Sequence, residues 1–206
     1  MNNPWRDVPL EVYEGHMKLE SIAQLQALNE IMSEQIASCR GEILMILGIA
    51  GGNGLEYIEG SNCNKVYGVD INKEYLDECV TRYGGIGGRF DPICVDLMEE
   101  GVELPKADRV IANLLIEYIG YDKFVAVLKR VKPQYVSCVI QINPSEGFVS
   151  DSPYMEQLNT LQAVHHQINE AELGERMKQP GYTYIYGKDT KMANGKILRR
   201  IDYIKE

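Results

Sequence analysis

The stretch that decides the fold is Glu42-Ile-Leu-Met-Ile-Leu-Gly-Ile-Ala-Gly-Gly-Asn-Gly-Leu-Glu56, followed a short way on by Val66-Tyr-Gly-Val-Asp70. An apolar run leads into a glycine-rich loop, and the second run ends in a lone carboxylate. Glycine has no Cβ, so it can adopt positive φ and let a ligand lie against the main chain. Loop N–H groups at the start of a helix can bind an anion, and an acid on the next strand can bind the two hydroxyls of a ribose. The two segments together predict a site for an adenosine-containing cofactor.

A dinucleotide is one cofactor that such a loop could bind. Its loops follow G-x-G-x-x-G, in which the third small residue allows a helix to pack closely against a strand. Gly52-Asn53-Gly54 supplies the first pair of glycines, but Tyr57 stands at the third position. The bulky ring argues against a pyrophosphate ligand. A nicotinamide or flavin oxidoreductase is therefore the less favoured alternative.

The loop resembles motif I of the class I S-adenosylmethionine-dependent methyltransferases, written D/E-x-G-x-G-x-G. In this alignment Gly48 replaces the acid and Ala50 the first glycine, while Gly52 and Gly54 match. The resemblance implies that Gly48, Ile49, Ala50, Gly52 and Gly54 bind the cofactor S-adenosyl-L-methionine. The missing acid leaves a third possibility, a module that binds this cofactor or a partner protein without catalysis.

Two further segments extend the resemblance over residues 41–142. Phe90-Asp-Pro-Ile-Cys-Val-Asp96-Leu resembles the third strand of these enzymes, whose terminal acid bonds the adenine amino group. Ala107-Asp-Arg-Val-Ile-Ala-Asn113-Leu-Leu-Ile-Glu-Tyr118-Ile resembles the fourth strand and the motif that faces the transferring methyl group. The cofactor contacts implied by the second, third and fourth strands are Asp70, Ile71, Asp96, Leu97 and Asn113.

The resemblance is closest to a group of small bacterial methyltransferases with the loop I-L-G-x-A-G-G-N-G, an E-Y-I/V after the fourth strand and an N-terminal Y-E-x-H-M. It implies that Glu117 or Tyr118 meets the substrate and could act as a base; the alternative is one solvated and one packed residue. It also implies that Tyr13, His16 and Met17 form a lid over the cofactor; otherwise they are packing residues. Transfer from a sulfonium needs mainly positioning and desolvation, and a base only when the nucleophile must lose a proton.

Composition narrows the function further. The chain has 206 residues, which suits one domain, and a formal net charge of −9, which disfavours a nucleic-acid surface. We therefore expect a small-molecule methyl acceptor, with monomer and homodimer both open. Five scattered cysteines without C-x-x-C, no signal-like N-terminus and no apolar run of membrane-spanning length predict a cytoplasmic protein. Adjacent His165 and His166 lack ligand spacing, so no metal is expected.

Periodicity predicts alternating strands and helices. Apolar spacing by threes and fours predicts helices over 18–37, 73–83 and 121–131, and helical structure over 153–167 and 168–178. Strands are expected at 42–47, 65–70, 89–95, 107–112 and 135–142. The segments 182–187 and 196–204, joined through Ala193-Asn194-Gly195, predict a terminal β-hairpin.

This pattern predicts an α/β fold with a mostly parallel sheet, an antiparallel C-terminal hairpin and helices on both faces. The resemblance implies that it is a Rossmann-like, single methyltransferase domain, residues 1–206, whose seven-stranded sheet has the order 3-2-1-4-5-7-6. Within it we expect an N-terminal helical lid at 1–40, a cofactor-binding core at 41–142, a substrate-covering insertion at 143–167, and a last helix and hairpin at 168–206.

Overall fold

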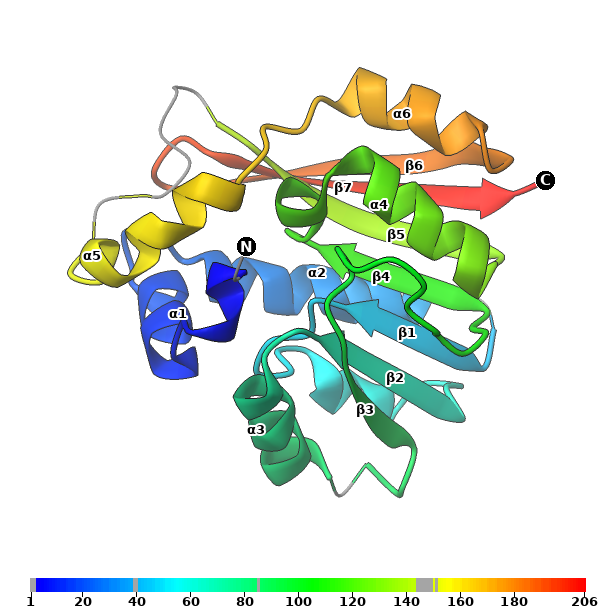
Figure 1. Ribbon diagram of the computed structural model, residues 1–206, viewed down its shortest axis with the longest axis horizontal. Helices are drawn as coiled ribbons and strands as arrows, with labels where there is room; N and C mark the ends of the chain where they lie inside the picture. Colours follow the sequence, from blue (N-terminus) through cyan, green and yellow to red (C-terminus); the bar gives the residue numbers. More distant parts are fainter. Residues whose placement is uncertain (1–2, 39–40, 85, 144–149, 151) are drawn as a thin grey trace.

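Seven strands form one sheet in the computed structural model, which describes residues 3–38, 41–84, 86–143, 150 and 152–206. The strands are β1 (Ile43–Leu47), β2 (Lys65–Asp70), β3 (Phe90–Cys94), β4 (Arg109–Asn113), β5 (Tyr135–Ile142), β6 (Tyr182–Lys191) and β7 (Ile197–Lys205). Their order is β3-β2-β1-β4-β5-β7-β6; the first five strands are parallel, and β7 runs antiparallel to β5 and β6 (Figure 1). The predicted order and terminal hairpin are confirmed.

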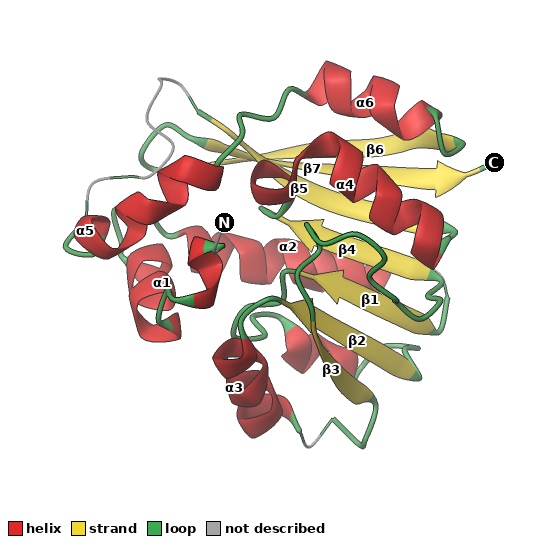
Figure 2. Cartoon of the chain, in the orientation of Figure 1, coloured by secondary structure: helices red, strands yellow, loops and turns green. Residues whose placement is uncertain are grey.

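Helices cover both faces of this sheet (Figure 2). The α-helices are α1 (Leu10–Lys18), α2 (Gln24–Ser38), α3 (Lys73–Tyr83), α4 (Ile116–Val131), α5 (Met155–Leu158) and α6 (Glu170–Lys178), and the 3₁₀ helices are η1 (Pro4–Arg6), η2 (Leu55–Ile58) and η3 (Asn159–Val164). Alternate side chains of a strand point to opposite faces. Leu44 and Ile46 of β1 accordingly pack in the core with α2 and α3, whereas Met45 and Leu47 pack in the core with α4 and α6.

The parallel strands bring their carboxyl ends to one edge of the sheet. Leu47 pairs with both Val69 and Ala112, so the residues that follow these three positions lie level with one another. The arrowheads of β1 and β4 point toward the side of the molecule where α1, α5 and the N-terminal segment lie (Figure 1). Open α/β sheets bind ligands at this edge.

The helix predicted over 18–37 was wrong at its start. The structure has two helices there, α1 and α2, separated by a turn at Leu19–Ala23 in which the N–H groups of Ile22 and Ala23 both donate to the Leu19 carbonyl. Ala23 has φ 51°, which no helix accommodates. Ile22 is buried in the turn and continues the apolar spacing, which is why the pattern concealed the break. The predicted stop near Arg40 lies outside the described residues; α2 ends at Ser38.

Two other predicted helical regions also differ. The segment 153–167 contains only the short α5 and η3 before the chain becomes extended at His165. Its buried Leu158 and Leu161 are three apart, the spacing at which a 3₁₀ helix aligns side chains. Helix α4 begins at Ile116, five residues before the predicted start, but non-helical Gly120 separates its first turn from the regular part. Residues 144–149 and 151 of the predicted insertion lie outside the described residues.

The glycine-rich loop does not lead into an α-helix, contrary to expectation. Only η2 follows it, because the N–H of Gly54 bonds to the Glu56 side chain and the next turn closes as 3₁₀. A Cβ on Gly54 would lie 2.3 Å from Cγ of Met32, and the residue has φ 93°. This glycine therefore lets α2 approach the loop.

Replacing that glycine tests the packing argument. We expect Gly54→Ala to lower the free energy of unfolding by about 2–4 kcal/mol, since it combines overpacking with a strained φ. Gly60→Ala is the matched control, because no atom lies within 4 Å of its added Cβ. Urea unfolding measures both, and an equal effect of the two substitutions would contradict the argument.

Candidate functional site

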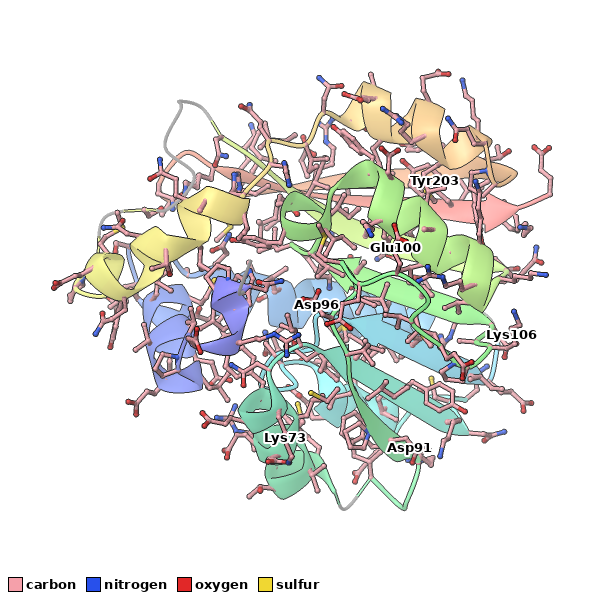
Figure 3. The ribbon with its side chains drawn as sticks, in the orientation of Figure 1. Lys73, Asp91, Asp96, Glu100, Lys106 and Tyr203 are labelled. Carbon is pink, nitrogen blue, oxygen red and sulfur yellow. The ribbon has the colours of Figure 1, made fainter. Side chains whose placement is uncertain are left out.

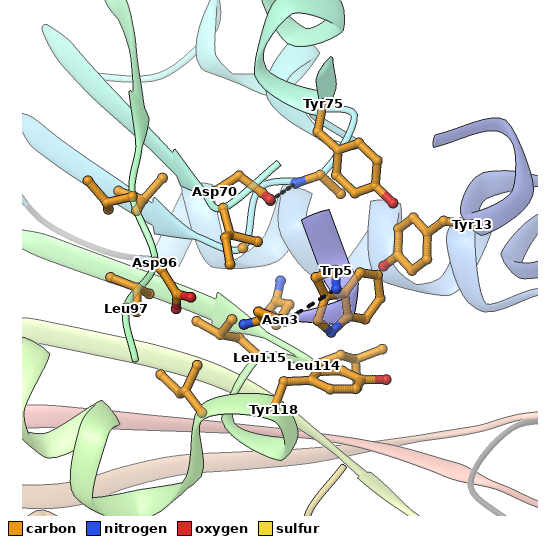
Figure 4. Close-up of a pocket in the computed structure, with 17 residues that line it drawn as sticks. Asn3, Trp5, Tyr13, Asp70, Tyr75, Asp96, Leu97, Leu114, Leu115 and Tyr118 are labelled. Carbon is orange, nitrogen blue, oxygen red and sulfur yellow. Dashed lines mark hydrogen bonds between the residues drawn. The ribbon is translucent and has the colours of Figure 1, made fainter. Parts of the chain in front are cut away.

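A cavity lies at the carboxyl ends of β1, β2, β3 and β4 (Figure 4). The structure brings together here most of the residues implied by the methyltransferase resemblance. Those that line the cavity are Tyr13, Gly48, Ala50, Asp70, Ile71, Asp96, Leu97, Asn113 and Tyr118.

Asp70 joins the end of β2 to the glycine-rich loop. Its Oδ2 accepts a hydrogen bond of 2.9 Å from the Ala50 N–H, and its Oδ1 accepts one of 3.0 Å from the Asn72 N–H. Asp70 is 9% exposed. Burial raises the pKa of its carboxyl, and hydrogen bonds from the backbone offset only part of that increase. Ala50 has φ 48°, a conformation that non-glycine residues adopt rarely and that clusters at functional sites. The loop and the carboxylate therefore meet at one point, as the sequence predicted.

Asp96 lies just after β3, the strand that pairs with β2, and also lines the cavity. Its Oδ1 accepts a hydrogen bond of 2.9 Å from the Met98 N–H, and its Oδ2 lies 3.5 Å from a guanidinium nitrogen of Arg6. Figure 3 shows Asp96 near the middle of the molecule, beside the N-terminal segment. A second acid thus lies at the cavity, with one oxygen directed toward that segment.

The glycines of the loop fall into two groups. Gly48 lines the cavity, and a Cβ there would come within 3.0 Å of Leu115. Gly52 and Gly54 do not line it; an added Cβ would meet Tyr83, Cys79 and Leu55 at Gly52, and Met32 at Gly54. Ile49 is buried in the core and lines a neighbouring cavity. Cofactor contact by Ile49, Gly52 and Gly54 stays a prediction.

Asn113 lines the cavity with its side chain already paired. Its Nδ2 donates to Oε1 of Gln35 at 2.8 Å, and its Oδ1 accepts from Nε2 of Gln35 at 2.9 Å. Gln35 lies on α2, so this reciprocal amide pair ties the end of β4 to the helix behind it. A contact between Asn113 and a cofactor likewise stays a prediction.

Trp5 is the residue that sequence reasoning missed. It lies in η1, and its ring makes edge-on contacts with Tyr13 (centroids 5.5 Å apart) and Tyr118 (4.9 Å). Asn72 fixes the segment by donating to the Trp5 carbonyl at 3.0 Å. It is the only tryptophan of the chain, but no motif or periodicity around it signals a role.

A second cavity adjoins the first and shares four of its lining residues, Trp5, Tyr13, Leu114 and Tyr118. Three predicted site residues that do not line the first cavity, His16, Met17 and Glu117, line the second. The aromatic rings of Trp5, Tyr13 and Tyr118 line both cavities, while Asp70 and Asp96 line only the first and Glu117 only the second. Two ligands bound in these cavities would meet at that aromatic wall.

Glu117 is the most unusual group of the second cavity. It is 2% exposed, and its Oε1 accepts a hydrogen bond of 2.8 Å from the Gln141 N–H. Its Oε2 is buried and has no hydrogen-bond partner among the described residues. Burial raises the pKa of the Glu117 carboxyl to about 7. Burial and the Glu117 charge raise the pKa of the neighbouring Tyr118 phenol well above its usual value.

The histidines near this cavity are poor bases. Burial lowers the pKa of His165 to about 4, with the charges of His166 and Lys196 adding to the effect, and burial lowers the pKa of His16. His16 Nδ1 lies 2.7 Å from the Ser152 hydroxyl. Within the described ranges, no group of three or more His, Cys, Asp or Glu side chains is placed to hold a metal ion. Nor does any helix in those ranges have the length and apolar character to cross a membrane.

Solved structures with the same fold place this arrangement in context. The chain is similar to magnesium protoporphyrin IX methyltransferase from Synechocystis PCC 6803, crystallised with bound SAH (12% identity, 98% of this chain and 96% of that one, TM-score 0.69). It is also similar to geranyl diphosphate C-methyltransferase from Streptomyces coelicolor A3(2), in complex with Mg²⁺, geranyl diphosphate and S-adenosyl-L-homocysteine (12%, 90% and 84%, 0.65). A third similar structure is the [4+2]-cyclase SpnF (13%, 87% and 80%, 0.64).

Sequence comparisons give no relative: no family model matches the chain, and no curated protein matches it. The fold is nevertheless that of the class I S-adenosylmethionine-dependent methyltransferases, with the same strand order and terminal hairpin. At 12–14% identity these similarities establish the fold alone.

Proposed function

We propose that the protein is an S-adenosyl-L-methionine-dependent methyltransferase that acts on a small-molecule acceptor. The observation that carries this proposal is the pair of adjoining cavities, one with the two strand-end acids and one with Glu117. When bound, the cofactor would supply a methyl group on a positively charged sulfur. The cofactor-bound neighbours with the same fold support this assignment.

The residues of the first cavity fit such a cofactor. Asp70 retains acceptor capacity on both oxygens for the ribose hydroxyls, since a carboxylate can accept about four hydrogen bonds. Asp96 would accept from the adenine amino group, with Ile71 and Leu97 providing apolar contact with the ring. Gly48 and Ala50 would bring bare main chain to the methionine end. Tyr13 would lie near the sulfonium, where an aromatic ring attracts a cation.

Glu117 is the better candidate for the base, and Tyr118 the poorer one. A general base is most effective when its pKa lies near the working pH, and the Glu117 carboxyl has a pKa of about 7. The raised pKa keeps the Tyr118 phenol protonated at neutral pH, so its role would be to form the wall between the two ligands.

The two alternatives from the sequence have less support. A nicotinamide or flavin dinucleotide would need loop N–H groups at a helix start for its pyrophosphate, but only η2 follows the loop. In addition, Tyr57 occupies the position where a dinucleotide loop has its third small residue, and its hydroxyl donates a hydrogen bond to Asn29. A non-catalytic binding module would not explain why one Glu117 oxygen is buried without a hydrogen-bond partner among the described residues. One structure with the same fold, SpnF, is named as a cyclase. The methylated product should therefore be measured as well as cofactor binding.

A thermal-shift comparison tests the cofactor. S-adenosylhomocysteine at a hundred times its Kd should raise Tm by about 5–10 °C, because binding to the native state alone stabilises by about 2.7 kcal/mol. NAD at the same concentration should leave Tm unchanged. A shift with NAD and none with S-adenosylhomocysteine would reverse the assignment.

A further inference from the structure

We propose that the second cavity binds a small organic ammonium ion, a primary or secondary amine in its protonated form, as the methyl acceptor. Its nitrogen would face the free Oε2 of Glu117 and the aromatic wall of Trp5, Tyr13 and Tyr118. The inference rests on the proposed function and adds the chemical class of the substrate.

The first argument is the missing partner of Glu117. A carboxylate held away from water and left half unpaired is costly, and proteins normally supply a partner for each such oxygen. Oε1 has the Gln141 N–H, whereas no described residue donates to Oε2. A ligand with an N–H donor in the cavity would complete the pairing, and a positive charge on that donor would strengthen it.

The aromatic wall is the second argument. Trp5, Tyr13 and Tyr118 come from η1, α1 and α4, and their side chains line the cavity together. Figure 4 shows the Trp5 ring between those of Tyr13 and Tyr118. Aromatic faces attract organic cations most strongly where water is excluded. A carboxylate beside several rings is therefore a combination suited to a substituted ammonium.

The charge of the cavity lining excludes the opposite class of ligand. None of the described residues that line it is a lysine or an arginine. His16 and His165 line it, but their lowered pKa values keep both neutral at pH 7. Lys196 lies near these histidines without lining the cavity. A phosphate or carboxylate acceptor would therefore meet Glu117 with no lining cation to offset the repulsion.

A second unpartnered atom belongs to the aromatic wall itself. The Trp5 indole Nε1–H is buried with no acceptor among the described residues, and indole nitrogen can only donate. An ether, hydroxyl or carbonyl oxygen on the amine would satisfy it. Because Trp5 lines both cavities, an oxygen acceptor on either ligand would complete this pairing.

The proton balance of the reaction follows from this placement. The ammonium gives one proton to Glu117 Oε2, which frees the nitrogen lone pair. That pair forms the new N–C bond as the S–C bond of the sulfonium donor breaks, with its electrons remaining on sulfur. The product is a methylated ammonium, and Glu117 later releases its proton to water.

A pair of probes with nearly the same shape tests the proposal without turnover. Protonated 2-methoxyethylamine and 1-methoxypropane differ in having a charged nitrogen with N–H donors or a neutral carbon at the end of the chain. Trp5 is the only tryptophan, so its fluorescence reports binding at the wall. With S-adenosylhomocysteine present, 2-methoxyethylamine should bind at least tenfold more tightly, as an order-of-magnitude expectation for a desolvated cation beside rings and a carboxylate.

Glu117→Gln should remove most of that preference, while the exposed Glu100→Gln, the matched control, should keep it. Equal binding of the two probes, no binding of either, or a preference that survives in Glu117→Gln would each overturn the ammonium assignment. The thermal shift with S-adenosylhomocysteine is read on the same samples. A thermal shift without selectivity for 2-methoxyethylamine refutes the acceptor class alone, and the absence of a thermal shift refutes the proposed cofactor.

A turnover measurement provides the second readout. 2-Phenylethylamine should gain one methyl group, detected by mass, at a rate well above that of 2-phenylethanol. Methylation of the alcohol in preference to the amine would contradict the proposal.

Discussion

Asp70→Ala is expected to abolish stabilisation by S-adenosylhomocysteine. The Asp70 carboxylate lies at the end of β2, where its free lone pairs face the first cavity. Hydrogen bonds to a charged acceptor contribute about 1.5–3 kcal/mol each, so losing two from ribose hydroxyls should raise Kd by roughly 10²–10⁴-fold. Isothermal titration calorimetry measures this directly.

Two further variants distinguish the loss of ribose binding from destabilisation of the loop. Asp70→Ala also deprives the N–H groups of Ala50 and Asn72 of their acceptor, so it could destabilise the loop itself. Asp70→Asn keeps the shape and one acceptor oxygen, and we expect it to fold and still to bind at least tenfold more weakly, since only one uncharged acceptor remains. Asp91→Ala, on the neighbouring strand β3 outside the cavity, should bind like the parent. Unchanged affinity in a folded Asp70→Asn protein would count against the ribose assignment.

Glu117→Gln is expected to lower kcat/KM for methylation of 2-phenylethylamine by about 10²–10⁴-fold, the usual contribution of a positioned general base. Affinity for S-adenosylhomocysteine should stay within a factor of two, because Glu117 lines only the second cavity. The parent rate should rise with pH around a midpoint near 7, and the variant should lack that limb. A parallel loss of cofactor affinity would point to a structural role instead.

The same substitution should make the ligand-free protein more stable at pH 8. Burial raises the folded-state pKa of Glu117 from 4.5 to about 7, so the folded state binds the proton more tightly than the unfolded chain does. Stability is then lost as pH rises from about 4.5 to 7 and stays low above it. The variant lacks this loss, and its advantage should reach about 2–3 kcal/mol. Urea unfolding at pH 5 and pH 8 measures the difference, with Glu100→Gln as the control expected to show none.

A gain in stability together with a loss of activity would identify Glu117 as a group kept for function. Residues that serve packing alone behave in the opposite way, since their replacement lowers stability. Tyr13 and Tyr118 line the same cavity but stay protonated between pH 5 and pH 8, because burial raises their pKa values well above the usual value; His16 and His165 line it as well. Comparing parent and variant at each pH removes their contribution, provided that those groups titrate alike in both proteins.

Local pattern was enough to predict the sheet and the two strand-end acids. The glycine-rich loop, the alternation of strands and helices and the Asn-Gly turn each involve residues close in sequence, and the resemblance to the methyltransferase family supplied the strand order. Helix α3 begins and ends at the predicted residues, with the Asn72 side chain capping its start. The break before α2 escaped prediction because a buried turn residue, Ile22, continued the helical spacing.

The amino-acid sequence by itself determined the alternation of strands and helices, the loop after β1 and the place of Asp70 and Asp96, since these follow from short-range periodicity and from where strands end. The resemblance to the methyltransferase family supplied the Rossmann-like strand order. Only the tertiary structure decided which polar groups are paired. The Asn113 side chain is hydrogen-bonded to Gln35, which lies 78 residues away in the sequence. Glu117 accepts one hydrogen bond from the Gln141 N–H, and its other oxygen has no partner among the described residues. Trp5 is held in the site by contacts distant in sequence, among them the hydrogen bond from Asn72 to its carbonyl. Burial and hydrogen-bond partners are set by side chains that meet through folding, and no local pattern encodes such meetings.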